Sequence, residues 1–180
     1  MKNLLLSIVL FVAITANAQK IYRATHAEIT FFSETPLENI DGTNTDAKSI
    51  ISTKNNEIAF AAAIVGFHFE KSLMEEHFNE DYMESDKYKA ASFKGKIIGD
   101  VDYDKDGVYP VKVKGILKIH GVEKEREITG TITIKDGKLS LLSEFNVKLE
   151  DHKVKVPKIV VKKIAESVKV TVKANYELKK

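Results

Sequence analysis

Residues 67–93 read FHFEKSLMEEHFNEDYMESDKYKAASF, and this stretch lacks the strand pattern that dominates the rest of the chain. Met74, Phe78 and Tyr82 recur every fourth residue within it. On an α-helix this spacing places three large apolar side chains on one face, with acidic residues on the opposite face. A short amphipathic helix between long strands is an element that covers the end of a small β-barrel. We therefore predict a helical lid here.

Polar residues in the same stretch predict where helical turns begin. Ser72 and Glu75 match the capping box, in which the Ser side chain accepts a hydrogen bond from a backbone N–H and the Glu side chain reaches back to the cap. Asn79 is suited to cap a second helical turn that runs toward Lys87.

The remainder of the chain alternates apolar and polar residues with a period of two. The clearest case is residues 168–178, where Val, Ala, Tyr and Leu alternate with Lys, Thr, Asn and Glu. Residues 111–119, 128–134 and 139–149 follow the same pattern. Alternation of this kind buries one face of each strand and exposes the other, which is typical of an antiparallel sheet.

Turn-forming dipeptides separate these segments. They are Asp41-Gly42, Asn55-Asn56, Asp106-Gly107, His120-Gly121 and Asp136-Gly137. The last three glycines are 14 and 16 residues apart, whereas turns in a β-sandwich recur every ~8–12 residues. This spacing favours an up-and-down antiparallel barrel over a sandwich. A barrel of about eight strands has room for one small ligand.

Two blocks of the sequence resemble the YceI-like family. Residues 74–88, MEEHFNEDYMESDKY, followed by FKG at 93–95, resemble the family's core signature, and residues 115–122, GILKIHGV, resemble a strand-and-turn motif of the family. Members of the family are lipocalin-like barrels of the bacterial periplasm that bind isoprenoid lipids. The resemblance implies a single all-β, lipocalin-like barrel domain over residues 19–180.

Residues 1–18 have the features of a secretion signal peptide. Lys2 supplies the positive end, an almost wholly apolar run extends from Leu4 to Ala16, and Ala16-Asn17-Ala18 is a small-x-small cleavage site. The apolar run is shorter than the ~20 residues of a transmembrane helix. The chain has no cysteine, so we expect neither a lipid-anchored cysteine nor a disulfide. The expected location is periplasmic or secreted.

The charge balance argues against a nucleic acid partner. Lys and Arg number 28 and Asp and Glu 26, and the formal charge of +2 falls to +1 without Lys2. Lysines dominate from Lys153 to the C-terminus. They predict either ordinary solvated faces or a basic surface in transient contact with anionic membrane headgroups. The sequence is also compatible with a homodimer.

Residues 58–69, IAFAAAIVGFHF, depart from the alternation because they are apolar at both parities. We predict a strand here, with two alternative explanations. Either a helix or the C-terminal segment covers its outer face, or Ala59, Ala61 and Ala63 are small in order to leave space for a ligand inside the barrel.

The sequence lacks the residue sets typical of an enzyme or a metal site. It has no nucleophile elbow, no Gly-rich phosphate loop and no cysteine. The five histidines lack ligand spacing, and residues 102–107 resemble only the start of a calcium loop, because Val113 stands where a bidentate Glu is required. We predict a non-enzymatic protein with no metal and no cofactor other than a bound isoprenoid lipid.

The remaining interpretation is binding of a small apolar or amphiphilic lipid. The residues expected to contact it are Phe31, Phe60, Phe67, Phe69, Met74, His77, Phe78, Tyr82, Phe93 and Phe145. A pocket lined in this way recognises an apolar chain by burial, and the family resemblance implies a quinone or polyprenyl lipid. Alternatively, these side chains fill a solid core, and the protein is a stress-related periplasmic barrel that acts through protein contacts.

His77 has two interpretations of its own. Beside Phe78 on the lid, a neutral imidazole is able to hydrogen-bond a quinone carbonyl or a prenyl hydroxyl. Alternatively, its ring bonds a backbone carbonyl and pins the helix to the rim of the barrel.

Overall fold

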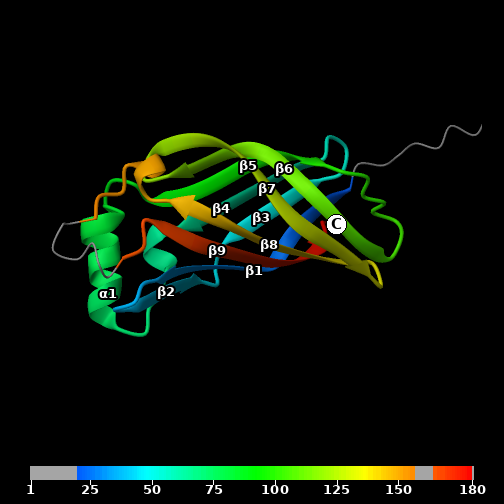
Figure 1. Ribbon diagram of the computed structural model, residues 1–180. Helices are drawn as coiled ribbons and strands as arrows, with labels where there is room; N and C mark the ends of the chain where they lie inside the picture. The colour runs from blue at the N-terminus through cyan, green and yellow to red at the C-terminus, as the bar shows by residue number, and fades with distance from the viewer. Residues whose placement is uncertain (1–19, 157–163, 180) are drawn as a thin grey trace, which may run out of the picture.

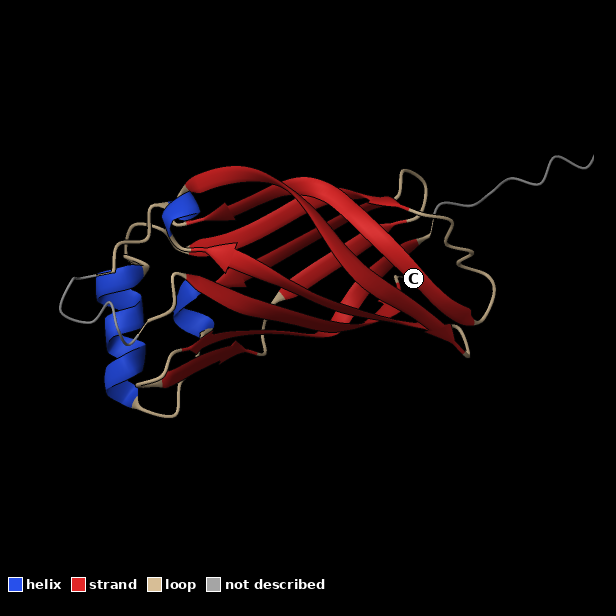
Figure 2. Ribbon diagram, in the orientation of Figure 1, coloured by secondary structure: helices blue, strands red, loops and turns tan. Residues whose placement is uncertain are grey.

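The computed structural model describes residues 20–156 and 164–179, and the predicted signal peptide lies outside them. The chain forms a closed antiparallel barrel with helices at one end (Figure 1, Figure 2). The strands are β1 (Ile21–Glu34), β2 (Asn39–Asn44), β3 (Lys48–Ser52), β4 (Glu57–Ala63), β5 (Ala90–Ile98), β6 (Gly107–Ile119), β7 (Val122–Lys135), β8 (Lys138–Lys148) and β9 (Ser167–Leu178). The helices are η1 (Ile64–Gly66), α1 (Ser72–His77), η2 (Phe78–Tyr82) and η3 (Glu150–His152).

The ring of the barrel consists of β1 and β3 to β9, and β2 is an additional strand. Consecutive strands from β3 to β9 pair as neighbours, and β1 pairs with both β3 and β9 to close the ring. Residues 21–23 of β1 pair with β3, whereas residues 29–34 pair with β2. Closure satisfies backbone groups that an open sheet would expose at its edges. The predicted up-and-down barrel is confirmed.

Tight turns of the predicted kind join β6 to β7 and β7 to β8. His120 and Gly121 have φ values of 50° and 73°, and Asp136 and Gly137 have values of 52° and 73°. Two successive positive φ values are those of a type I′ hairpin turn, whose twist matches that of the flanking strands. The turn predicted at residues 41–42 is wrong, because both residues pair with β1 inside β2.

The end of the barrel farther from the lid has a solid core. Tyr176 donates a hydrogen bond to Ser49 Oγ (2.7 Å), which in turn donates to the Ala59 carbonyl (2.9 Å). Burial raises the pKa of Tyr176, so its hydroxyl remains a donor. Ile51 and Ile132 are 0% exposed beside it in the same core cluster. Burial of these side chains stabilises the barrel from within.

Ion pairs run along the outer faces of β6 to β9. The pairs are Lys112–Glu127 (3.0 Å), Lys114–Glu125 (3.0 Å), Lys118–Glu123 (3.1 Å), Lys169–Glu144 (3.0 Å) and Lys173–Glu28 (3.4 Å). Exposed cross-strand pairs contribute only about 0.2–1 kcal/mol each. Two of these lysines, Lys169 and Lys173, belong to the region after Lys153 that was a candidate basic surface, and their positive charges are neutralised.

The strand predicted over residues 58–69 is shorter than expected. β4 ends at Ala63, whose carbonyl accepts a hydrogen bond from Asn44 Nδ2 (2.9 Å). The chain then turns through η1, and His68 forms an isolated bridge with Thr43 of β2. The side-chain amide therefore takes the place of the next ladder partner and ends the strand.

The burial pattern of β4 contradicts the hypothesis that its alanines face the inside of the barrel. Ile58 and Ala62 are buried inside the barrel, whereas Ala61 and Ala63 are exposed. Ala59 has the same parity as these exposed residues. The hypothesis that the three alanines leave space inside the barrel is therefore wrong. A covering helix is also absent from the described residues, because the outer face of β4 is open to solvent at two of these alanines.

The predicted lid is present as one continuous helical segment across the end of the barrel (Figure 1). α1 continues directly into η2, which is a π-helix, a form that is rare and frequent at functional sites. The predicted caps are wrong. Ser72 is already helical, Glu75 accepts a hydrogen bond from the Phe69 N–H (3.2 Å), and Asn79 Nδ2 donates to the Glu75 carbonyl (2.9 Å) inside the helix.

Candidate ligand-binding cavity

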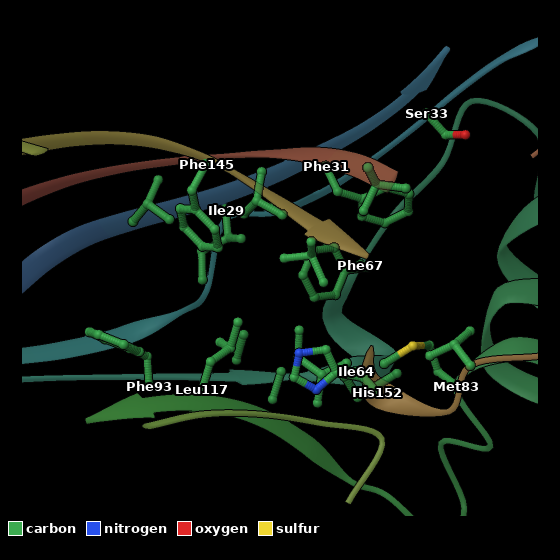
Figure 3. Close-up of a pocket in the computed structure, with 18 of the residues that line it drawn as sticks. Ile29, Phe31, Ser33, Ile64, Phe67, Met83, Phe93, Leu117, Phe145 and His152 are labelled. Carbon is green, nitrogen blue, oxygen red and sulfur yellow. The ribbon is translucent and has the colours of Figure 1, made fainter. Parts of the chain in front are cut away.

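A cavity of about 590 Å³ lies inside the barrel beneath the lid. This volume falls within the ~300–1,000 Å³ of typical small-molecule sites. Its wall is formed by β1, β2, β4 to β9, the helical lid, and η3, and the lining side chains are predominantly apolar (Figure 3). The barrel is thus solid at one end and hollow at the other.

All ten residues predicted to contact a ligand lie in the wall of this one cavity. They are Phe31, Phe60, Phe67, Phe69, Met74, His77, Phe78, Tyr82, Phe93 and Phe145. They come from β1, β4, β5, β8, the lid and the segment after η1, so only the closed fold brings them together. Contact with a ligand stays a prediction for each of them.

Four phenylalanines join the lid to the barrel wall. The Phe78 ring centroid lies 5.4, 5.6 and 5.1 Å from those of Phe31, Phe67 and Phe69, respectively. Centroid separations of ~4.5–7 Å are those of attractive aromatic pairs. Gly42 makes room for the cluster, because a Cβ there would lie 2.6 Å from the Phe31 ring. This phenylalanine cluster therefore holds the lid over the cavity.

The deeper wall of the cavity is also aromatic. Phe60, Phe93 and Phe145 point into the barrel but are only partly buried, as is Ile29. Figure 3 shows Phe93 and Phe145 across the cavity from each other, away from Met83 near the lid. Part of each side chain borders the cavity instead of other protein atoms. When an apolar chain covers a surface of this type, apolar area is removed from water, and this burial favours binding.

The rim of the cavity carries charge beside exposed apolar side chains. Lys71 Nζ lies 3.5 Å from Glu38 Oε1, and both residues line the cavity. Leu37 directly precedes Glu38 and is 64% exposed, and Leu73 follows Lys71 by two residues and is 60% exposed. The entrance is thus amphipathic, whereas the interior is not.

His77 lies on the lid at the edge of the cavity. Its Nδ1 is 2.6 Å from Asp81 Oδ2, one helical turn further along, and the two side chains are about half exposed. The predicted bond to a backbone carbonyl is therefore wrong, because the partner is a carboxylate of the same helix. A role for His77 toward a ligand head group stays a prediction.

Sequence reasoning missed His152, a fully buried residue of the cavity wall. Its Nδ1 donates a hydrogen bond to the Val122 carbonyl (3.1 Å). Its Nε2 has no hydrogen-bond partner among the described residues. Burial lowers the pKa of His152 below its usual 6.5, so the ring is neutral near pH 7. No motif in the sequence distinguishes it from the other histidines.

His120, in the motif of residues 115–122, fixes the position of η3 by contacts with its backbone and with the end of the lid. Its Nδ1 donates to the His152 carbonyl (3.2 Å), and its Nε2 lies 2.7 Å from Glu84 Oε2, just after the lid. Its ring packs edge-on against Tyr88, with centroids 4.4 Å apart. His120 therefore connects the β6–β7 turn, η3 and the end of the lid, which is more than the turn position that the sequence indicates.

Acidic side chains at the opposite end stabilise turns. Asp102 Oδ1 accepts a hydrogen bond from the Asp104 N–H (3.0 Å), and Asp106 Oδ2 accepts one from the Asp136 N–H (3.1 Å). Lys20 pairs with the Asp104 carboxylate. Across residues 20–156 and 164–179, no three acidic or histidine side chains gather into a metal-binding group. None of the helices in these ranges combines the length and apolar character needed to span a membrane.

A comparison with protein families supports this fold. The model of the YceI-like domain matches residues 21–176. The chain belongs to the YceI-like family. The match covers the whole barrel, from the first strand to the last, and thus confirms the resemblance inferred from two short motifs.

Solved structures share the fold of this YceI-like protein at low sequence identity. A polyisoprenoid binding domain from Saccharophagus degradans, implicated in plant cell wall breakdown, is 14% identical with a TM-score of 0.76, and 88% of this chain and 98% of that chain are covered. BcnA from Burkholderia cenocepacia is 12% identical with a TM-score of 0.69, covering 83% and 95%. A Campylobacter jejuni YCEI protein is 16% identical with a TM-score of 0.56, covering 100% and 90%. A comparison with curated proteins found no match.

Proposed function

We propose that this YceI-like protein is a non-enzymatic carrier or buffer for an amphiphilic isoprenoid lipid of quinone or polyprenyl type. The observation that carries the proposal is the cavity of about 590 Å³, with aromatic walls and a lid that a phenylalanine cluster holds in place. The polyisoprenoid binding of the Saccharophagus degradans domain supports the same ligand class. The lipid is the partner of the protein and occupies the barrel without chemical change.

Burial of the chain supplies the driving force. At about 0.8 kcal/mol per buried carbon, a fifteen-carbon prenyl chain contributes roughly 12 kcal/mol. Association and ordering cost about 4–15 kcal/mol, so a chain of this length lies near the lower limit for useful affinity. Each further five-carbon unit that still fits the cavity tightens binding. The affinity should therefore rise with chain length and level off when the cavity is full.

Location and entry form part of the same proposal. The apolar run and cleavage site in residues 1–18 support export to the periplasm or the cell exterior. The exposed Leu37 and Leu73 beside the Lys71–Glu38 pair support brief contact with a membrane surface at the rim. A lipid would then enter beneath the lid and pass the phenylalanine cluster.

The alternative of a barrel that acts only through protein contacts assumed a solid interior. The interior is solid around Tyr176 and Ile132, but it is hollow beneath the lid. In addition, Lys169 and Lys173 of the lysine-rich C-terminal region have acidic partners. These observations favour the carrier over the alternative.

Lipid extraction tests the proposal. The protein is purified from its native host without detergent and extracted with organic solvent, and the extract is analysed by mass spectrometry. We expect an isoprenoid lipid at close to one molecule per protein, and rebinding of that lipid by the delipidated protein. An empty extract, together with no binding of farnesol or of a longer polyprenol, would refute the carrier function.

A further inference from the structure

Among the described residues, His152 supplies the one buried side-chain atom of the cavity wall that has no hydrogen-bond partner. Three buried side-chain atoms of the described residues have no hydrogen-bond partner: Asn79 Oδ1, Tyr103 Oη and His152 Nε2. Only His152 belongs to the cavity wall. The hydroxyls of Ser33 and Ser143, which also line the cavity, bond the Ala165 N–H (2.9 Å) and the Thr129 carbonyl (2.6 Å), respectively.

The hydrogen bond on the other side of the ring determines what Nε2 is able to do. The Val122 carbonyl only accepts hydrogen bonds, so the Nδ1 that lies 3.1 Å from it must carry a proton. Burial lowers the pKa of His152, which leaves the ring neutral. In a neutral imidazole with its proton on Nδ1, Nε2 is an acceptor. The partner that satisfies it must therefore be a donor.

We propose that His152 Nε2 accepts a hydrogen bond from a hydroxyl group of the bound lipid. The inference rests on the proposed carrier function and narrows its ligand: a prenyl alcohol or a quinol fits, whereas an ether or a quinone carbonyl does not. A buried acceptor without a donor is costly, so the site discriminates against the analogue that lacks the hydroxyl.

This arrangement also orients the lipid. Figure 3 shows the His152 ring near Ile64, between Met83 on the lid side and Phe93 on the far side of the cavity. A hydroxyl at His152 leaves the chain free to run toward the aromatic wall formed with Phe145. The backbone of His152 is fixed by a hydrogen bond, which its carbonyl accepts from His120 Nδ1 (3.2 Å).

A matched pair of ligands tests the inference. Farnesol and farnesyl methyl ether share one apolar chain, but only farnesol donates a hydrogen bond. Binding of each to the delipidated full-length mature protein is measured by calorimetry or tracer displacement. We expect a preference of about 10-fold for farnesol, the size of one buried hydrogen bond. His152→Phe, which keeps a ring but removes the acceptor, should abolish this preference. The control His26→Phe, at an exposed histidine of β1 outside the cavity wall, should keep it.

A second measurement needs no variant. In protein labelled with ¹⁵N-histidine, the Nε2 resonance of His152 reports its hydrogen bond directly. We expect it to shift when farnesol is added and to stay nearly unchanged with the methyl ether. Equal affinities for both ligands, or an unchanged resonance with farnesol bound, would overturn the role of His152 while leaving the carrier function intact. Failure of both ligands and of longer polyprenols to bind would overturn both.

Discussion

Replacement of Ile29 by tryptophan should place an indole in the cavity without unfolding the barrel. Ile29 lines the cavity and is only partly buried, so a larger ring at this position extends into a space of about 590 Å³. The matched substitution is Ile132→Trp. Ile132 is 0% exposed and lies outside the cavity wall, so the same change there forces an indole against packed atoms.

The two substitutions should differ clearly in stability. Overpacking of a filled core costs about 1–3 kcal/mol, and 1 kcal/mol corresponds to roughly 2–4 °C in Tm for a domain of this size. We therefore expect Ile132→Trp to lower the Tm by about 3–10 °C, and Ile29→Trp to change it by less than about 2 °C. Lipid binding should show the opposite order, with farnesol affinity weakened in Ile29→Trp and kept in Ile132→Trp.

The assay benefits from the composition of the chain. The protein has no tryptophan, so each variant carries a single indole whose fluorescence reports both unfolding and its surroundings. Thermal unfolding and farnesol titration are followed on the same samples. Equal destabilisation by the two substitutions, or undiminished farnesol binding by the Ile29 variant, would show that the cavity does not exist in solution or does not hold the ligand.

Other predictions concern packing, pH and the lid. Gly115→Ala should lower the free energy of unfolding by about 3 kcal/mol in chemical denaturation, because its Cβ would lie 2.3 Å from the Lys94 carbonyl oxygen. Gly137→Ala should lower it by only about 1 kcal/mol, because Gly137 has a φ of 73° but open space around its Cβ position. The pKa of His152 is lowered in the folded state, so the unfolded chain takes up a proton at this residue more readily. The contribution of His152 to the free energy of unfolding is therefore complete above pH 6.5 and is lost as the pH falls. His152→Phe should flatten the pH profile of the denaturation midpoint between about pH 7 and pH 5. Phe78→Ala should speed farnesol release severalfold in stopped-flow measurements, because it removes the ring on which the phenylalanine cluster is centred. An unchanged release rate would mean that the lid does not control exit.

The patterns that predicted the fold are those that depend on one strand or helix at a time. Alternation in residues 168–178 and positive-φ turns such as Asp136-Gly137 reflect local geometry, and both appear as expected. The spacing of Met74, Phe78 and Tyr82 likewise predicts the lid. Because all large aromatic residues of an inward face point into the same barrel, even the cavity wall follows from these local patterns.

The features that sequence reasoning missed depend on contacts between distant segments. β4 ends at Ala63 because Asn44, 19 residues earlier, bonds its carbonyl. Asp41-Gly42 continues a strand because β1 is long enough to pair with it. His152 becomes part of the cavity through Val122, 30 residues away. No periodicity or motif encodes such pairings, so they emerge only from the folded chain.

Photo-crosslinking tests whether an isoprenoid chain lies inside this barrel. A prenol with a diazirine near the end of its chain is bound to the wild-type protein and irradiated, and the labelled peptides are identified by mass spectrometry. We predict labelling of interior residues around Phe93 and Phe145, competed by farnesol and reduced in Ile29→Trp. Labelling confined to exposed side chains such as Leu37 or Ile116, or labelling that farnesol does not compete, would show that the lipid does not occupy the barrel.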